Sequence, residues 1–219
     1  MHIYHDLCST GEGVMELSEK HGFANYKLFN RMFREIYGCK PSDVRKNKGG
    51  ADMDVRPAYI GELPELKAMF REITDHMNHS NVRIWDEIYP CAFLEEDIRA
   101  GRLYILKNGD DIAAAFALCE SNEGEPFVKW ENADAKALYI DRLGVNVKYL
   151  RQGLGRVMLR NAAELAFRKN AEYLRLFVVD INEPAVHLYR ENGFAQAEGI
   201  YEEKFDDFVL REYGFEKRL

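Results

Sequence analysis

A glycine-rich turn between a predicted strand and a predicted helix constrains the fold of this 219-residue chain more than any other feature. The turn lies in YLRQGLGRVML, residues 149–159. A strand is expected before it over 136–147, and a run typical of a helix follows from about 154 to 170. The first N–H groups of a helix have no partner inside it, and the helix dipole makes this end positive. The turn therefore predicts an anion-binding site.

Two glycines and two arginines give this turn its chemical character. Gly153 and Gly155 carry no Cβ that would keep a ligand away from the backbone, and Arg151 and Arg156 add positive charge. A Walker loop is excluded, because it needs Lys and then Ser or Thr after its last glycine. A dinucleotide fingerprint would need a third glycine where Met158 stands. From the two glycines alone, a plain helix-entry turn is an equally good interpretation.

A second pattern follows within forty residues and favours the binding interpretation. A strand rich in β-branched and aromatic residues is expected over 172–180, followed by a helix within 181–194. Asn182 suits the N-cap of this helix and Gly193 suits its stop. The segment spells V-x-x-x-N-x-x-A-x-x-L-Y-x-x-x-G-F. With both patterns in this order, the chain resembles the GNAT superfamily of acyl-CoA N-acyltransferases over roughly 54–219.

The resemblance implies acetyl-CoA as co-substrate and no metal. The phosphate-loop pattern of the family, Q/R-x-x-G-x-G/A, falls on residues 150–155, with Leu150 where Arg or Gln is usual. In the family the pyrophosphate is held mainly by backbone N–H groups of this loop, and the preceding strand pairs with the pantetheine arm. Carried over to this sequence, the cofactor-binding residues are Leu143, Val145, Arg151, Gln152, Gly153, Leu154, Gly155, Arg156, Asn182 and Ala185.

The resemblance also implies catalytic residues. Tyr189 matches the tyrosine that serves many members as general acid near the sulfur; its alternative is a packed aromatic in an amphipathic helix. Asp141 is the carboxylate available on the preceding strand and is the candidate general base. An Asp paired with Arg142 or another cation is an equally good interpretation of it. The acceptor site is expected near His79, Arg83, Trp85 and Asp86.

The larger part of the chain predicts an α/β (α+β) fold. A strand is expected over 54–59, a helix over 63–77, a second helix within 87–101 that breaks near Pro90, and a hairpin turning at 108–111. The resemblance implies a mixed, mostly antiparallel central sheet flanked by helices.

The N-terminal part differs in charge from the rest. Residues 20–48 hold eight Lys and Arg against two acidic residues, although the whole chain has a net charge of −7. We expect a small all-α segment over 1–48, a linker over 49–53 and the acyltransferase domain over 54–219. The segment 15–46 resembles the second half of an AraC-type DNA-binding domain, a helix-turn-helix. The matching residues are Gly22, Phe23, Tyr26, Phe29, Arg31, Phe33, Gly38, Pro41 and Arg45.

Two functions remain open at this point. The first is an N-acetyltransferase that acts on a primary amine of a small molecule or peptide by direct transfer in a ternary complex. The second is an AraC-type regulator with an acyl-CoA-binding sensor domain. Because one half-sized motif presents one recognition helix, we expect DNA binding to be weak or absent. Phe29 and Phe33 are expected to cover the larger domain or to support a homodimer. Neither a membrane span nor a signal peptide is indicated, and a cytoplasmic location is expected.

Overall fold

The computed structural model describes residues 6–7, 12–23, 25–37, 40–42, 55–80, 82–204 and 208–219, of which 35–37 by backbone only. The chain divides into two compact units, Met1–Met53 and Asp54–Leu219. The predicted linker 49–53 lies outside the described residues. In the described part of the chain, no helix has the length and apolar character that crossing a membrane would need.

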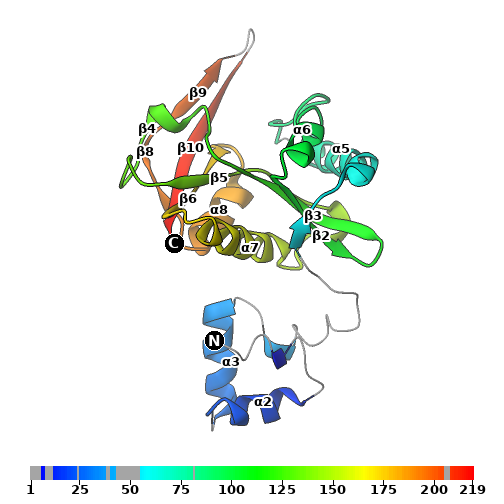
Figure 1. Cartoon of the computed structure of the whole chain (residues 1–219), viewed down its shortest axis with the longest axis vertical. Helices are drawn as coiled ribbons and strands as arrows, with labels where there is room; N and C mark the ends of the chain where they lie inside the picture. Colours follow the sequence, from blue (N-terminus) through cyan, green and yellow to red (C-terminus); the bar gives the residue numbers. More distant parts are fainter. Residues whose placement is uncertain are drawn as a thin grey trace. The chain divides into compact units, whose positions relative to one another are not determined.

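The larger unit is built on a twisted central sheet (Figure 1). Within the described residues it has eight strands in the order β1-β2-β3-β5-β6-β10-β7, with β9 also paired to β10. β5 and β6 are parallel, whereas every other neighbouring pair is antiparallel. The strands are β1 Val55–Pro57, β2 Leu103–Asn108, β3 Asp111–Cys119, β5 Ala137–Val145, β6 Tyr173–Val179, β7 Ala195–Gln196, β9 Tyr201–Lys204 and β10 Val209–Arg218. The predicted mixed, mostly antiparallel sheet is confirmed.

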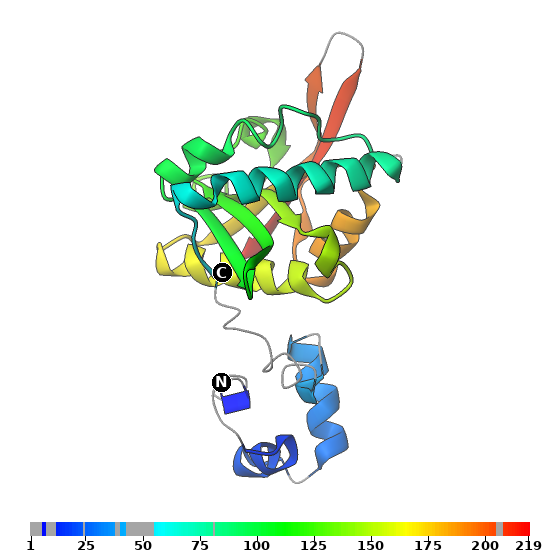
Figure 2. The same cartoon turned by 90° about the vertical axis from the view of Figure 1, so that its right-hand side faces the viewer.

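Helices cover both faces of this sheet. Figure 2 shows α5, Leu63–His79, across one face and α7, Leu154–Arg168, across the other. The short α6, Leu94–Arg99, packs beside α5, and α8 is Glu183–Glu191. A small second sheet pairs β4, Val128–Lys129, with β8, Glu198–Gly199. Single-turn 3₁₀ helices occupy Ile60–Glu62, Glu125–Phe127 and Val147–Tyr149.

The apolar periodicity of the sequence accounts for these elements. In α5 the residues at helical spacing are buried as expected: Leu66, Met69, Phe70 and Ile73. They pack on β2 and β3 in one hydrophobic core. The predicted second helix is shorter than 87–101: residues before α6 form turns around Pro90, which has no N–H to donate to a helix.

The smaller unit has a core of its own. α2, Val14–Lys20, is followed by Gly22, whose φ of +85° suits a residue without a Cβ, and α3 spans Tyr26–Tyr37. Phe29 and Phe33 are each only 1% exposed and pack with Leu7 and Leu17. The expectation that these two rings cover another surface is therefore wrong, because this unit buries them itself. Met32, one position before Phe33, is 36% exposed.

Candidate functional site

The two parallel strands at the centre of the sheet separate along their length. β5 and β6 pair from Ala137 with Tyr173 up to Ile140 with Leu176, and no further. Beyond that point β5 continues against β3, and β6 continues against β10. Residues 141–145 of β5 therefore have no strand partner on the side that faces β6. An unpaired strand edge presents N–H and C=O groups that an extended ligand can use.

A β-bulge shapes β5 at the point of separation. Ala117 and Ala115 of β3 oppose Asp141 and Gly144, so β5 has one residue more than its partner. The extra residue is accommodated at Arg142, which has a left-handed φ of +53°. Gly144 is required here by packing, because a Cβ would lie 2.7 Å from the ring of Phe70. The bulge interrupts the alternation of side chains between the two faces of β5 and so changes which of them point into the opening.

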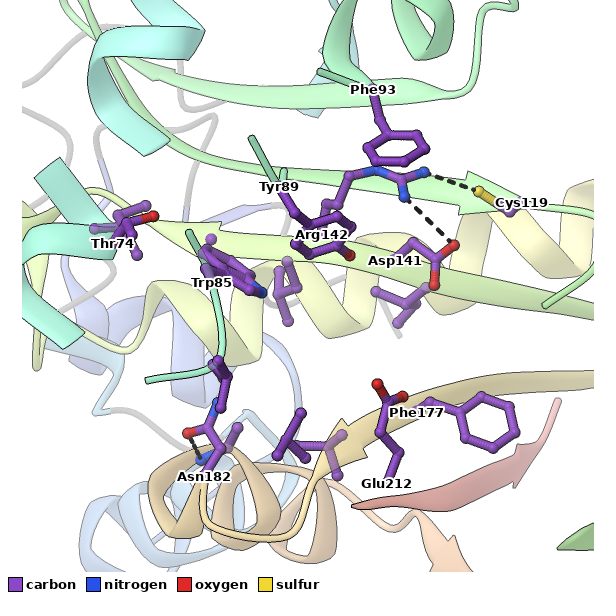
Figure 3. Close-up of a pocket in the computed structure, with 18 of the residues that line it drawn as sticks. Thr74, Trp85, Tyr89, Phe93, Cys119, Asp141, Arg142, Phe177, Asn182 and Glu212 are labelled. Carbon is purple, nitrogen blue, oxygen red and sulfur yellow. Dashed lines mark hydrogen bonds and ion pairs between the residues drawn. The ribbon is translucent and has the colours of Figure 1, made fainter. Parts of the chain in front are cut away.

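A large cleft of about 2060 Å³ opens where the strands separate. It is bounded by α5, the loop before α6, the ends of β3, β5 and β6, α8, and the β9–β10 hairpin. Figure 3 shows its middle, with β5 on one side and β6 and β10 on the other. Of the predicted site residues, the cleft is lined by Asp141, Leu143, Val145, Asn182, Ala185 and Tyr189.

The glycine-rich turn lies at the mouth of α7, next to Leu150, the last residue of this segment that lines the cleft. In the part of the chain that the structure describes, the backbone N–H groups of 151–156 have no hydrogen-bond partner. Gly153 is the N-cap, with a φ of +79°, and a Cβ there would meet nothing within 4 Å. The first turn of α7 contains no acidic residue. These unpaired donors at a positive helix end fit an anionic group.

The other residues of the turn have different roles. A Cβ on Gly155 would lie 2.9 Å from Leu188, so the absence of a side chain allows α7 to pack on α8. The sequence suggested that Gly155 lets a ligand approach the backbone, but the structure explains this glycine by close helix packing. Arg156 lies 3.7 Å from Glu191, and the Gln152 amide donates to the Lys148 carbonyl at 3.5 Å. Arg151, like Gly153, has a left-handed φ and is exposed, whereas Leu154 is buried.

Asn182 and Ala185 meet at the start of α8. The Asn182 side chain accepts a hydrogen bond from the Ala185 N–H at 3.3 Å, which confirms Asn182 as the predicted N-cap. Both residues line the cleft beside the separated strands. The start of α8 therefore lies at the edge of the opening, with the Ala185 and Val186 N–H groups already bonded to Asn182.

Tyr189 of α8 packs against neighbouring rings and also lines the cleft. Its ring packs near Phe194 and Phe215, at centroid distances of 6.0 and 6.1 Å, and the residue is 7% exposed. It also lines the cleft, and among the described residues its hydroxyl has no hydrogen-bond partner. Burial, with the negative charge of Asp141, raises the pKa of Tyr189. The phenol therefore keeps its proton at neutral pH.

Asp141 is engaged by its neighbours. Its carboxylate accepts a hydrogen bond from Asn122 at 3.1 Å and lies 3.7 Å from the Arg142 guanidinium (Figure 3). Burial raises the pKa of Asp141, although Arg142, Cys119 and Asn122 act in the opposite direction. The structure therefore contains the pairing of Asp141 with Arg142 that was the alternative interpretation of this residue.

Arg142 and Asp97 form a buried ion pair that sequence reasoning missed. Two guanidinium nitrogens of Arg142 reach the Asp97 carboxylate at 2.7 and 3.1 Å, and Asp97 is fully buried. Arg102 donates to the same carboxylate at 2.6 Å. The Phe93 ring lies over the guanidinium at 5.5 Å. Since Asp97 comes from α6, this pair fixes the bulge of β5 to a distant helix, and no local pattern predicts it.

A group of carboxylates on one wall of the cleft was also missed. Glu212 of β10, Glu203 of β9 and Glu123 of the β3–β4 connection all line it, and none has an ion-pair partner within the described residues. Burial raises the pKa of Glu212 to about 7, helped by the negative charges of Glu203 and Asp141. Burial and Glu123 raise the pKa of Glu203. We call Glu123, Glu203 and Glu212 the acidic wall.

Most of the residues expected near the acceptor lie in the wall of the cleft. Arg83, Trp85 and Asp86 line it, but His79 does not. α5 continues through His79, whose ring bonds the Asp75 carbonyl one turn back at 2.6 Å. Among the described residues, no three His, Cys, Asp or Glu side chains lie together in a way that could hold a metal.

Comparison with known proteins identifies the family. The model of the acetyltransferase (GNAT) family matches residues 67–194, more than half of the chain. This chain belongs to that family. Among solved structures, a GNAT-family acetyltransferase from Streptococcus agalactiae has a TM-score of 0.65 at 16% identity, covering 78% of this chain and 97% of its own. An Arabidopsis thaliana protein solved in complex with acetyl-CoA has a TM-score of 0.57 at 15% identity, covering 76% and 99%.

Curated relatives match shorter stretches. Streptothricin acetyltransferase of Streptomyces lavendulae is 41% identical over 58 residues, which are 26% of this chain and 31% of that protein. Thialysine N-epsilon-acetyltransferase of Sus scrofa is 33% identical over 78 residues, 34% of this chain and 46% of that protein. This chain spans between 31% and 57% of the length of the first curated relatives it matches.

Proposed function

We propose that this protein transfers the acetyl group of acetyl-CoA to an amine, directly within a ternary complex. The observation that carries the proposal is the separation of β5 from β6. It opens a cleft in which an unpaired strand edge, a buried tyrosine and unpaired carboxylates lie together, close to a positive helix end. Membership of the GNAT family supports the same reaction.

The residues fit acetyl-CoA in three places. The unpaired edge of β5 at Leu143 and Val145 would hold the pantetheine arm, and the free N–H groups of 151–156 would hold the pyrophosphate. The α8 start at Asn182 and Ala185 would contact the arm from the other side of the opening. When bound, acetyl-CoA supplies an acetyl thioester. The chain's part is to orient this thioester toward the amine and to exclude water from it.

Tyr189 is proposed to supply the proton that the departing sulfur needs. Its raised pKa keeps the hydroxyl protonated, and its buried ring is held by Phe194 and Phe215. A fixed O–H group at the reacting centre can protonate a thiolate as the C–S bond breaks. Asp141, already bonded to Asn122 and close to Arg142, is suited to orient neighbouring groups.

The acceptor is proposed to be an amine that carries a further positive charge. The acidic wall has no cation of its own in the described part of the chain, so an ammonium group of the substrate would relieve its mutual repulsion. The names of two relatives, a streptothricin and a thialysine N-epsilon-acetyltransferase, support an amine as acceptor.

An amine panel tests the reaction and the acceptor class together. With thiol release from acetyl-CoA as readout, kcat/KM for a diamine should exceed that for a monoamine of equal length by about tenfold, which corresponds to ~1.4 kcal/mol. The ratio should fall as salt is added, because salt screens the partly exposed carboxylates. A ratio near one at low salt would contradict the cationic acceptor. Absence of thiol release with every amine would contradict the acetyltransferase itself.

The N-terminal unit supports a weaker second proposal, attraction to DNA. On α3 the side chains of Lys27, Arg31 and Arg34 are exposed, which gives this helix a basic outer face. Such a face supports salt-sensitive, sequence-independent contact with phosphates. The resemblance of residues 15–46 to an AraC-type half-domain lies outside 67–194, the residues that the family model matches, and stays a prediction.

We expect no strong preference for a DNA sequence. Gel-shift titrations at physiological salt should give similar affinities for random and genomic duplexes, since one recognition helix buries roughly 600–1,000 Å². Replacing Arg31 and Arg34 with alanine should weaken binding to both kinds of duplex equally. A site preferred by ~10³-fold or more would support the regulator instead.

A further inference from the structure

We propose that Glu212 is the general base of the reaction, accepting a proton from the ammonium group of the acceptor. The proposal rests on the proposed acetyl transfer and replaces Asp141 in the role that the sequence suggested for it. A base in this reaction has to lie in the cleft, have a free carboxylate oxygen, and be ionised near neutral pH without holding a permanent cation. Glu212 meets each condition.

The β9–β10 hairpin directs Glu212 into the cleft. The Glu212 backbone lies in the sheet between Val179 of β6 and Tyr201 of β9. Leu210 and Glu212 line the cleft, whereas Arg211 between them pairs with Glu202 on the exposed side. Figure 3 shows the Glu212 side chain extending from β10 into the opening, on the side opposite Asp141.

The surroundings of Glu212 are negative or neutral. Glu203 and Tyr201 face it from β9, Asp141 from β5, and Tyr89 from the loop before α6. Tyr189 of α8 lines the same cleft. In the described part of the chain no Lys, Arg or His pairs with Glu212. Burial and these negative neighbours raise the pKa of Glu212 to about 7, where a carboxylate both accepts and releases a proton readily.

Asp141 is less suited to accept the proton. One of its oxygens accepts from Asn122 at 3.1 Å, and the other lies 3.7 Å from Arg142. Arg142 is itself held by Asp97 at 2.7 Å, so this arrangement is fixed. Protonation of Asp141 would weaken both contacts. Asp141 therefore acts as a positioning residue opposite the base.

The protons balance as follows. The Glu212 carboxylate takes one proton from the R–NH₃⁺ group and becomes a neutral acid. The free amine forms a C–N bond to the thioester carbonyl carbon, and the C–S bond breaks. The sulfur receives the Tyr189 proton, and the nitrogen gives its second proton back to the Tyr189 oxygen. Glu212 then releases its proton to water through the open cleft. The net products are the amide, the free thiol and one proton.

The test compares pH profiles of wild-type protein and two glutamine variants. With an amine of pKa above 9, wild-type kcat/KM should rise with pH and level off above about 7, because this ratio reports the ionisation of groups in the free protein. Glu212→Gln should lower kcat by at least tenfold at pH 8 and remove this break, while acetyl-CoA affinity from calorimetry stays within about twofold. Glu202→Gln, on the outward face of the adjacent strand, is the matched control and should keep the wild-type profile.

Glu203→Gln tests whether the break in the pH profile comes from Glu212, because a purely structural role of Glu212 would leave the pH of that break unchanged. It removes one negative charge beside Glu212, so the break should persist but shift to lower pH.

Glu212 favours its neutral form in the folded state, so its ionisation costs stability as pH rises from 4.5 to about 7. Glu212→Gln should therefore raise the melting temperature relative to wild type at pH 8 more than at pH 5.

Four outcomes overturn the proposal. A break near pH 7 that survives in Glu212→Gln, or unchanged kcat in that variant, would show that Glu212 is not the base. A break lost instead in Asp141→Asn, with Glu212→Gln unaffected, would return the role to Asp141. A wild-type protein that acetylates no amine would contradict the proposed function first, and this inference with it.

Discussion

Replacing Tyr189 with phenylalanine should lower kcat by ~10²-fold and leave acetyl-CoA affinity nearly unchanged. The ring is held by packing against Phe194 and Phe215, and phenylalanine keeps that packing. Among the described residues the lost hydroxyl bonds no protein group, so the fold loses nothing that depends on it. The expected loss is therefore confined to the proton that the departing sulfur needs. Steady-state kinetics at saturating substrates, with calorimetry for acetyl-CoA, measures both quantities.

A second tyrosine provides the control for this substitution. Tyr173 is also buried on the sheet, but its hydroxyl donates to Glu131 at 3.1 Å and the residue does not line the cleft. Tyr173→Phe removes a hydroxyl without touching the proposed site, so its kcat should match wild type. Equal turnover in Tyr189→Phe and wild type, with chemistry rate-limiting, would leave Tyr189 only a packing role.

Replacing Gly153 with valine should weaken acetyl-CoA binding by well over tenfold, since ~1.4 kcal/mol is already a factor of ten. In the protein alone a Cβ at this position meets nothing within 4 Å. The new side chain would instead occupy the open side of the turn, where the free N–H groups of 151–156 are proposed to meet the pyrophosphate. Isothermal titration calorimetry gives the change in affinity.

Backbone strain has to be separated from this effect, because Gly153 has a φ of +79° that valine adopts poorly. Gly109 in the β2–β3 hairpin offers a matched control, with a φ of +62° and equally open surroundings. Gly109→Val should lower the melting temperature to a similar extent and leave acetyl-CoA affinity unaltered. If a folded Gly153→Val protein bound acetyl-CoA like wild type, the turn would not be the pyrophosphate site.

The sequence by itself determined the order and type of the main elements. The apolar spacing of Leu66, Phe70 and Ile73 specified a helix and its buried face, because burial of one stripe is a local, periodic requirement. The Asn182 cap was readable for a similar reason: capping joins residues three positions apart. The glycine-rich turn between a strand and a helix was equally readable, because it lies in one continuous segment.

Only the tertiary structure decided which side chains meet in the cleft. Asp97 reaches Arg142 across 45 positions, and a bulge, which no residue pattern in β5 announces, sets the direction of that arginine. Glu212 becomes a candidate base because a hairpin brings Glu203 beside it and the separated strands bring Asp141 near. Burial and the charges of distant neighbours set the pKa of a carboxylate, and these depend on long-range pairing of strands. For that reason the sequence located the proposed cofactor turn but not the proposed base.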